Sequence, residues 1–162
     1  MAMTTDKKAK LTLPAEDQIL VTREFDAPKH LVYKAWTTPE LVARWWTARR
    51  GTAREMEIDL RVGGRWRYVM IARGGHEVAF HGEFREIVPD ERIVTTEVYE
   101  PMPGDGALDT VTFTEVDGRT TLELLMDCGS KEVRDAIIDS GMEDGLQDAL
   151  ELLEEVAREL DS

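Results

Sequence analysis

The chain has 162 residues, a length typical of one domain and sufficient to bury a hydrophobic core without disulfides or metals. Hydrophobic residues make up 42% and charged residues 33% of it, and no apolar run approaches the roughly 18 residues of a membrane-spanning helix. The formal net charge of −13 argues against nucleic acid and membranes as partners. Residues 1–10 have no apolar core, so no secretory signal is expected and we expect a cytoplasmic protein.

The N-terminal part of the chain predicts a tail, one strand and two short helices. Residues 1–16 are polar and are expected to be a flexible tail, which leaves 17–162 as a single domain. Ile19–Phe25 is rich in β-branched and aromatic residues and predicts the first strand, so ordered structure should start near Gln18. Asp26-Ala-Pro28 is typical of a helix start, with Asp26 as the candidate cap, and Thr38 is the candidate cap of a second short helix.

The middle of the chain predicts a meander of strands. From residue 52 to residue 126 the apolar residues recur with a period of two, interrupted by turn signals such as Gly63-Gly64 and Asp117-Gly118. Six strands joined by turns this short must pair antiparallel, because parallel pairs need long crossover connections. Gly82, inside one of these strands, predicts a bend or a close approach of another group to the backbone.

The C-terminal part predicts two helices. Ser130 is placed to cap the first, and a longer helix from about Gly141 to Leu160 has one apolar stripe and an acidic back. Residues 127–162 contain twelve acidic and three basic residues, so most of the excess negative charge lies here. We interpret the acidic back as a solvated surface that favours solubility, and it also offers a charged face to a partner.

These elements predict an α+β fold in which a curved antiparallel sheet of six or seven strands wraps around the long C-terminal helix. The two short helices after the first strand would close one end. Side chains on the inward face could enclose a cavity or fill the core, and both alternatives stay open. The cavity candidates are Trp46, Trp66, Tyr68, Met70, Phe80, Phe84, Thr95, Tyr99, Phe113, Leu124, Met126, Met142 and Leu146.

Several sequence stretches resemble a known family. They are Arg23–Pro28, Val32–Glu40, Arg44–Trp46, Asp59–Arg67, Phe80–Ile87, Pro89–Ile93 and Gly141–Gly145. Together, over about residues 18 to 160, the chain resembles a START-like (helix-grip) domain of the SRPBCC superfamily. Within it the chain is similar to the branch named for the activator of the 90-kDa heat-shock-protein ATPase. The resemblance implies a seven-stranded sheet gripping the C-terminal helix, but it transfers no ligand set and no catalytic constellation.

Reactive side chains are sparse. The three histidines have no metal-ligand spacing, and no cofactor, metal or catalytic residue is assigned. His81 alternates with Phe80 and is expected to point outward. Cys128, the single cysteine, excludes an internal disulfide, and Asp127 beside it makes it a poor nucleophile.

Two further positions leave alternatives open. Trp45 and Trp46 cannot both face one core, so one should pack and the other should line the cavity mouth or a partner surface. Glu97 shares the inward parity of Thr95 and Tyr99. Because an unpaired buried carboxylate is costly, Glu97 is functional, paired with an arginine, or displaced by a bulge.

The leading hypothesis is a domain that binds an apolar or aromatic small molecule between the sheet and the C-terminal helix. One alternative is a chaperone-associated interaction protein, for which the acidic helix offers a surface. The other is a cavity enzyme of the polyketide cyclase or aromatase type. It is less favoured because only Glu97 with a tyrosine offers an acid–base pair. We expect a monomer or weak dimer.

Overall fold

A computed structural model describes residues 8–101 and 106–161 of the chain. The strands are β1 (Lys10–Thr12), β2 (Gln18–Phe25), β3 (Gly51–Ile58), β4 (Arg65–Ala72), β5 (Glu77–Val88), β6 (Arg92–Tyr99), β7 (Ala107–Val116) and β8 (Arg119–Asp127). The helices are α1 (Lys29–Thr37), α2 (Pro39–Trp45), α3 (Lys131–Asp139) and α4 (Met142–Leu160). All eight strands form one antiparallel sheet in the order β1-β2-β8-β7-β6-β5-β4-β3.

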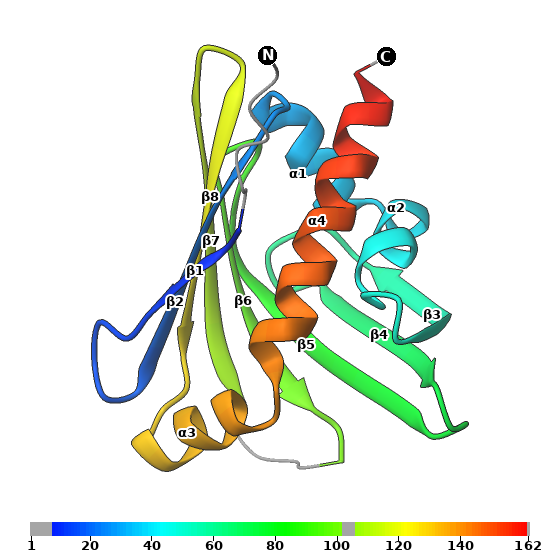
Figure 1. Ribbon diagram of the computed structural model, residues 1–162, viewed down its shortest axis with the longest axis vertical. Helices are drawn as coiled ribbons and strands as arrows, with labels where there is room; N and C mark the ends of the chain where they lie inside the picture. Colours follow the sequence, from blue (N-terminus) through cyan, green and yellow to red (C-terminus); the bar gives the residue numbers. More distant parts are fainter. Residues whose placement is uncertain (1–7, 102–105, 162) are drawn as a thin grey trace.

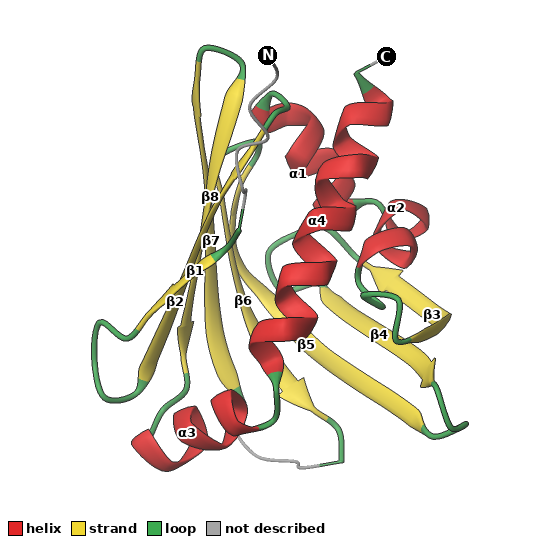
Figure 2. Ribbon diagram, in the orientation of Figure 1, coloured by secondary structure: helices red, strands yellow, loops and turns green. Residues whose placement is uncertain are grey.

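The sheet curves around α4, which crosses its concave side (Figure 1). Helices α1 and α2 pack against α4 at one end, and α3 lies near the start of α4 at the other (Figure 2). The α+β class and the wrapping of a sheet around a C-terminal helix are therefore confirmed. Within the described ranges, none of the helices has both the length and the apolar character needed to cross a bilayer.

The core lies between strands β2 and β8 and helix α4. Alternate residues of β2 and β8 are buried because successive strand side chains point to opposite faces. On α4 the buried residues follow the helical period of three and four. The core residues from these three elements are Ile19, Val21, Phe25, Leu122, Leu124, Met126, Ala149, Leu150, Leu153, Val156 and Ala157.

The sheet has one strand more than the six or seven expected from the sequence. The eighth is β1, which pairs with β2 in the segment expected to be a tail, so ordered structure starts before Gln18. The side chain of Gln147 on α4 holds the adjacent backbone, accepting from Ala9 N at 2.9 Å and donating to Ala9 O at 2.8 Å. Three residues are too few to display a hydrophobic period, so the sequence does not reveal this strand.

The helix starts agree with the sequence only in part. Ser130 caps α3 as expected, its hydroxyl accepting from Val133 N at 3.1 Å. The expectation that Asp26 caps α1 is wrong, because Pro28 occupies that position with no side-chain hydrogen bond. The Asp26 carboxylate instead pairs with Arg119 at 3.0 Å.

Gly82 is required by a close approach between strands β5 and β6. A Cβ atom at this position would lie 1.8 Å from the carbonyl oxygen of Thr96 and 2.6 Å from Trp66 Nε1. The register of the two strands shifts a little further along, between Phe84 and Glu86. Any side chain at position 82 would therefore force the two strands apart.

The acidic back of α4 is paired rather than simply solvated. Arginines of α2 and of the turn that follows it lie alongside α4. The pairs are Arg44–Glu159, Arg49–Glu151 at 3.9 Å, Arg49–Glu155 at 3.5 Å and Arg50–Asp148 at 2.7 Å. These acidic side chains remain 41–62% exposed, so the helix back is solvated as expected and is also paired within the chain.

Candidate functional site

Five aromatic side chains form a continuous row on the concave face. They come from β4, β5, β6 and the turn after α2, and we call them the aromatic row. Its contacts are Trp66–Tyr68 at 4.8 Å, Trp46–Tyr68 at 5.4 Å, Trp46–Phe80 at 5.7 Å and Phe80–Tyr99 at 5.0 Å between ring centroids. All four pairs are tilted or edge-to-face, as aromatic quadrupoles favour.

The aromatic row runs from the core to solvent. Trp66 is 7% exposed, whereas Tyr99 at the other end is 39% exposed. Trp46, Tyr68 and Phe80 lie between these extremes and are half-buried. Ring surface that faces the interior of the fold but is not sealed by other side chains is available to a ligand.

Two acidic side chains of β6 and β7 lie beside the aromatic row. Burial, followed by the negative charge of Glu97 and a hydrogen bond between the two carboxyl groups, raises the pKa of Asp109 well above its usual range. Burial and then the charge of Glu97 also raise the pKa of Tyr68. Glu97 therefore lies near both groups, and all three belong to one site.

Two buried polar atoms at this site have no hydrogen-bond partner among the described residues. They are Asp109 Oδ1, on a residue that is 8% exposed, and Trp66 Nε1. The Trp66 nitrogen lies over Gly82. The pairs His81↔Val98 and Phe84↔Thr95 place Gly82 opposite Glu97. We call Trp66, Tyr68, Glu97 and Asp109 the polar cluster.

The polar cluster combines donors with acceptors. The indole N–H of Trp66 donates, the phenol of Tyr68 does both, and ionised carboxylates only accept. Leaving such groups unpaired in the interior costs about 1–3 kcal/mol each. A bound molecule or ordered water that pairs with them would recover this free energy.

The cavity candidates named from the sequence separate into groups. Trp46, Tyr68, Met70, Phe80, Thr95, Met142 and Leu146 are half-buried, Tyr99 is exposed, and Trp66, Phe84, Phe113, Leu124 and Met126 are buried. Phe113 lies in a different aromatic cluster, where it contacts Tyr33 at 5.7 Å and Trp36 at 6.3 Å. The structure therefore does not bring Phe113 together with the aromatic row.

Of the three alternatives for Glu97, the structure supports neither pairing with an arginine nor displacement by a bulge. No arginine or lysine forms an ion pair with it in the part of the chain that the structure describes. Its strand is regular at this position, since the register shift lies at Phe84/Glu86 on β5. The sequence analysis did not identify Asp109. Asp109 alternates along β7 in step with the buried residues Ala107 and Val111, and this alternation could have indicated that its side chain points inward.

The two adjacent tryptophans divide as expected. Trp45 is buried, stacks on Trp36 at 4.9 Å and donates its Nε1–H to Ala35 O at 2.9 Å. Trp46 is half-buried and lies in the aromatic row, touching Tyr68 and Phe80. One ring therefore packs in the core and the other lines the candidate site.

The remaining reactive side chains lie elsewhere or are poorly activated. His81 is exposed and its Nδ1 lies 3.0 Å from Glu100, whose pKa is lowered to about 2, chiefly by a hydrogen bond from Arg67. Burial and then the charge of Asp127 raise the pKa of the Cys128 thiol, which disfavours the reactive thiolate. Over residues 8–101 and 106–161, no three His, Cys, Asp or Glu side chains are grouped to hold a metal ion.

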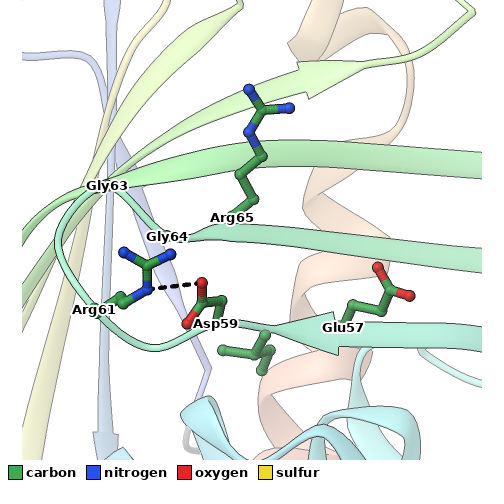
Figure 3. A pocket seen from close by; sticks show the side chains of 7 residues that line it. Glu57, Asp59, Arg61, Gly63, Gly64 and Arg65 are labelled. Atoms are coloured by element: carbon green, nitrogen blue, oxygen red, sulfur yellow. Dashed lines mark hydrogen bonds and ion pairs between the residues drawn. The ribbon is translucent and has the colours of Figure 1, made fainter.

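A hollow of about 380 Å³ lies on the β3–β4 hairpin, outside the aromatic row and the polar cluster (Figure 3). Its charged side chains are solvated, and Arg61 donates to Asp59 at 2.9 Å while Arg65 extends away from that pair. The turn backbone is satisfied by β5, through Gly63 N to Phe84 O at 2.8 Å and Phe84 N to Gly64 O at 2.9 Å. This hollow therefore lacks the unpaired buried atoms of the polar cluster.

A sheet wrapped around a C-terminal helix, with an inward-facing site, defines a START-like domain of the SRPBCC superfamily. Residues 26–158 match the family described as Activator of Hsp90 ATPase homolog 1-like protein, and the chain belongs to this family. No sequence among the curated proteins is similar enough to count as a match.

Solved structures share the fold. A protein from Rhodobacter sphaeroides is 25% identical, with a TM-score of 0.85 over 91% of this chain and 95% of that chain. A protein from Chromobacterium violaceum is 27% identical, with a TM-score of 0.74 over 86% and 96%. The AHSA1-like protein from Aeromonas hydrophila is 22% identical, with a TM-score of 0.66 over 88% and 94%.

Proposed function

We propose that this protein binds a small aromatic molecule on the concave face of the sheet, between α4 and strands β4 to β6. The observation that carries the proposal is the half-exposed aromatic row ending at a polar cluster with unpaired buried atoms. A completely filled core would seal the rings and would pair Asp109 Oδ1 and Trp66 Nε1. A ligand would stack on the rings and bond to the cluster.

The contacts available suit a ligand of one or two rings. Each favourable aromatic pair contributes roughly 0.5–1.5 kcal/mol beyond the area that it buries. With one or two hydrogen bonds to the polar cluster, we expect micromolar affinity, about −8 kcal/mol. We also propose that the protein is cytoplasmic and that it is a monomer or a weak dimer.

The two other functions receive less support. A chaperone-associated role would use the acidic back of α4, but there Asp148, Glu151, Glu155 and Glu159 already pair with arginines of the same chain. An enzyme of the cyclase type would find an acid–base pair in Glu97 and Asp109. We propose binding ahead of catalysis because partly exposed rings favour stacking with an aromatic ligand, which requires no catalytic residue.

A fluorescence titration with the neutral probe phenylnaphthylamine tests the proposal. We expect binding near one-to-one, and a melting temperature that rises with probe concentration by mass action. Trp46→Leu should weaken binding strongly because it removes the centre of the aromatic row. Trp36→Leu is the matched control, since Trp36 contacts Trp45 and Phe113 instead.

A second variant keeps the test decisive if the first fails to fold. Met142→Trp adds a ring at the half-buried start of α4 and should block the probe while leaving the melting temperature almost unchanged. If the interior is solid, the same change should overpack it and destabilise by about 1–3 kcal/mol. Absence of probe binding to the parent, together with that destabilisation, would refute the proposed function.

A further inference from the structure

The polar cluster contains two acids and no base, and we infer that the natural ligand is an aromatic amine whose ammonium group binds between Glu97 and Asp109. This inference rests on the proposed function and deepens it by naming the class of ligand. Three observations carry it: the uncompensated charge, the unpaired buried atoms, and the rings that surround them.

No basic side chain among the described residues compensates the negative charge of the Glu97–Asp109 pair. Among the residues described, neither Glu97 nor Asp109 forms a salt bridge. The buried arginines are engaged elsewhere, Arg23 with Glu154 at 3.0 Å and Arg134 with Asp135 at 3.0 Å. Attraction between opposite charges strengthens as water is excluded, so the interior favours a cation.

The unpaired atoms show which groups the ligand must present. Asp109 is about nine-tenths buried and its Oδ1 has no donor, while Trp66 is equally buried and its Nε1 has no acceptor. The two are not bonded to each other. An ammonium group supplies three donors, enough for Asp109 Oδ1 and the Glu97 carboxylate together. An acceptor oxygen on the same molecule would pair with the indole N–H.

The aromatic row also favours a cation over other ligands. The faces of Trp, Tyr and Phe rings attract ammonium groups, most strongly where water is excluded. A neutral alcohol would satisfy Asp109 Oδ1 but leave the negative charge shared by Glu97 and Asp109 without a cation. An anion would be repelled by Glu97 and would find donors only on Trp66 and Tyr68. The ranking expected is therefore amine, then alcohol, then carboxylate.

Three probes of equal shape test this ranking: naphthylmethylamine, naphthylmethanol and naphthoate, titrated against the intact protein at pH 7. We expect the amine to bind roughly tenfold or more tightly than the alcohol, and naphthoate to bind weakest. The advantage should persist at high salt, because charges in the interior are screened much less than surface charges.

Isosteric variants test whether the carboxylates of Glu97 and Asp109 cause the preference for the amine. Glu97→Gln and Asp109→Asn should each reduce amine binding several-fold and leave alcohol binding almost unchanged. Glu123→Gln is the matched control, since it removes one charge from the exposed, opposite face of the sheet on β8. Cooperative melting at or above the melting temperature of the parent would show that the two variants fold, so that a loss of amine binding reports on the site.

The outcomes separate this inference from the proposed function. If no probe binds, the proposed function itself fails. If naphthylmethanol or naphthoate binds as tightly as the amine, the fold binds a ligand but the inference about its charge is overturned. It is also overturned if Glu123→Gln weakens amine binding as much as Glu97→Gln, because the net charge of the protein would then explain the preference.

Discussion

Replacing Glu154 on α4 with glutamine should destabilise the protein more than any other single charge neutralisation on that helix. Glu154 Oε1 accepts from Arg23 Nη1 at 3.0 Å and Oε2 accepts from Asp26 N at 2.9 Å. The side chains of Arg23 and Glu154 are 3% and 10% exposed. Arg23 also donates to the carbonyl of Glu24 at 2.9 Å. In the described ranges, no acid other than Glu154 forms an ion pair with Arg23.

The size of the effect follows from burial. Removing one partner of a buried ion pair costs about 3–5 kcal/mol, because the other charge stays buried without compensation. Glutamine keeps one acceptor oxygen, so we expect about 3 kcal/mol, the lower end of that range. For a chain of this size each kcal/mol shifts the melting temperature by roughly 2–4 °C, which predicts a loss of about 6–12 °C.

Urea denaturation and thermal melting followed by circular dichroism measure this loss. Glu151→Gln is the matched control on the same helix, where the pair with Arg49 spans 3.9 Å and is largely exposed. Exposed pairs contribute roughly 0–1 kcal/mol, so this variant should melt close to the parent. If Glu154→Gln and Glu151→Gln melt alike, the reasoning from burial is refuted.

Three further outcomes follow from the fold. Gly82→Ala should destabilise by more than the ~1 kcal/mol of a typical point mutant, because its Cβ would lie 1.8 Å from Thr96 O, and a melting curve like the parent's would contradict this. Asp109 has a folded pKa above the unfolded value of about 3.9, so the folded state loses stability as the pH rises from about 4. Asp109→Asn should therefore stabilise at pH 7, with the gain disappearing near pH 3 in denaturation series. Ser130→Ala should cost about 1 kcal/mol through the lost cap on Val133 N, measurable by urea denaturation.

The elements that the sequence predicted have either a regular apolar period or, for the short helices α1 to α3, a helix-start signal. Strand β2, the six strands from β3 to β8 and helix α4 each repeat an apolar pattern over several positions, which local steric rules translate directly into structure. Strand β1 has three residues and no readable period, and only its pairing with β2 defines it. The pattern of residues along the chain therefore explains why these elements were predicted and why strand β1 was not.

The candidate site depends on contacts that no local pattern contains. Glu97 was recognised as an inward carboxylate by its parity, but its neighbour Asp109 gains meaning only once β6 and β7 are in register, with Thr95 opposite Asp109. The buried pair of Arg23 and Glu154 joins residues 131 positions apart. Such partners are fixed by the tertiary fold, so the sequence could suggest that these groups need partners without identifying them.

The order of strands in the sheet constrains how the chain folds during synthesis. Strand β2, which is synthesised well before β8, pairs with β8 along its whole length, from Gln18↔Asp127 to Phe25↔Thr120 (Figure 1). Until β8 emerges, β2 lacks its inner neighbour and exposes unpaired backbone, and α4 follows later still to cover the concave face. Such non-local pairing is slow and leaves apolar strands open to aggregation. The sheet and its helical cover therefore stay incomplete until both β8 and α4 have been translated.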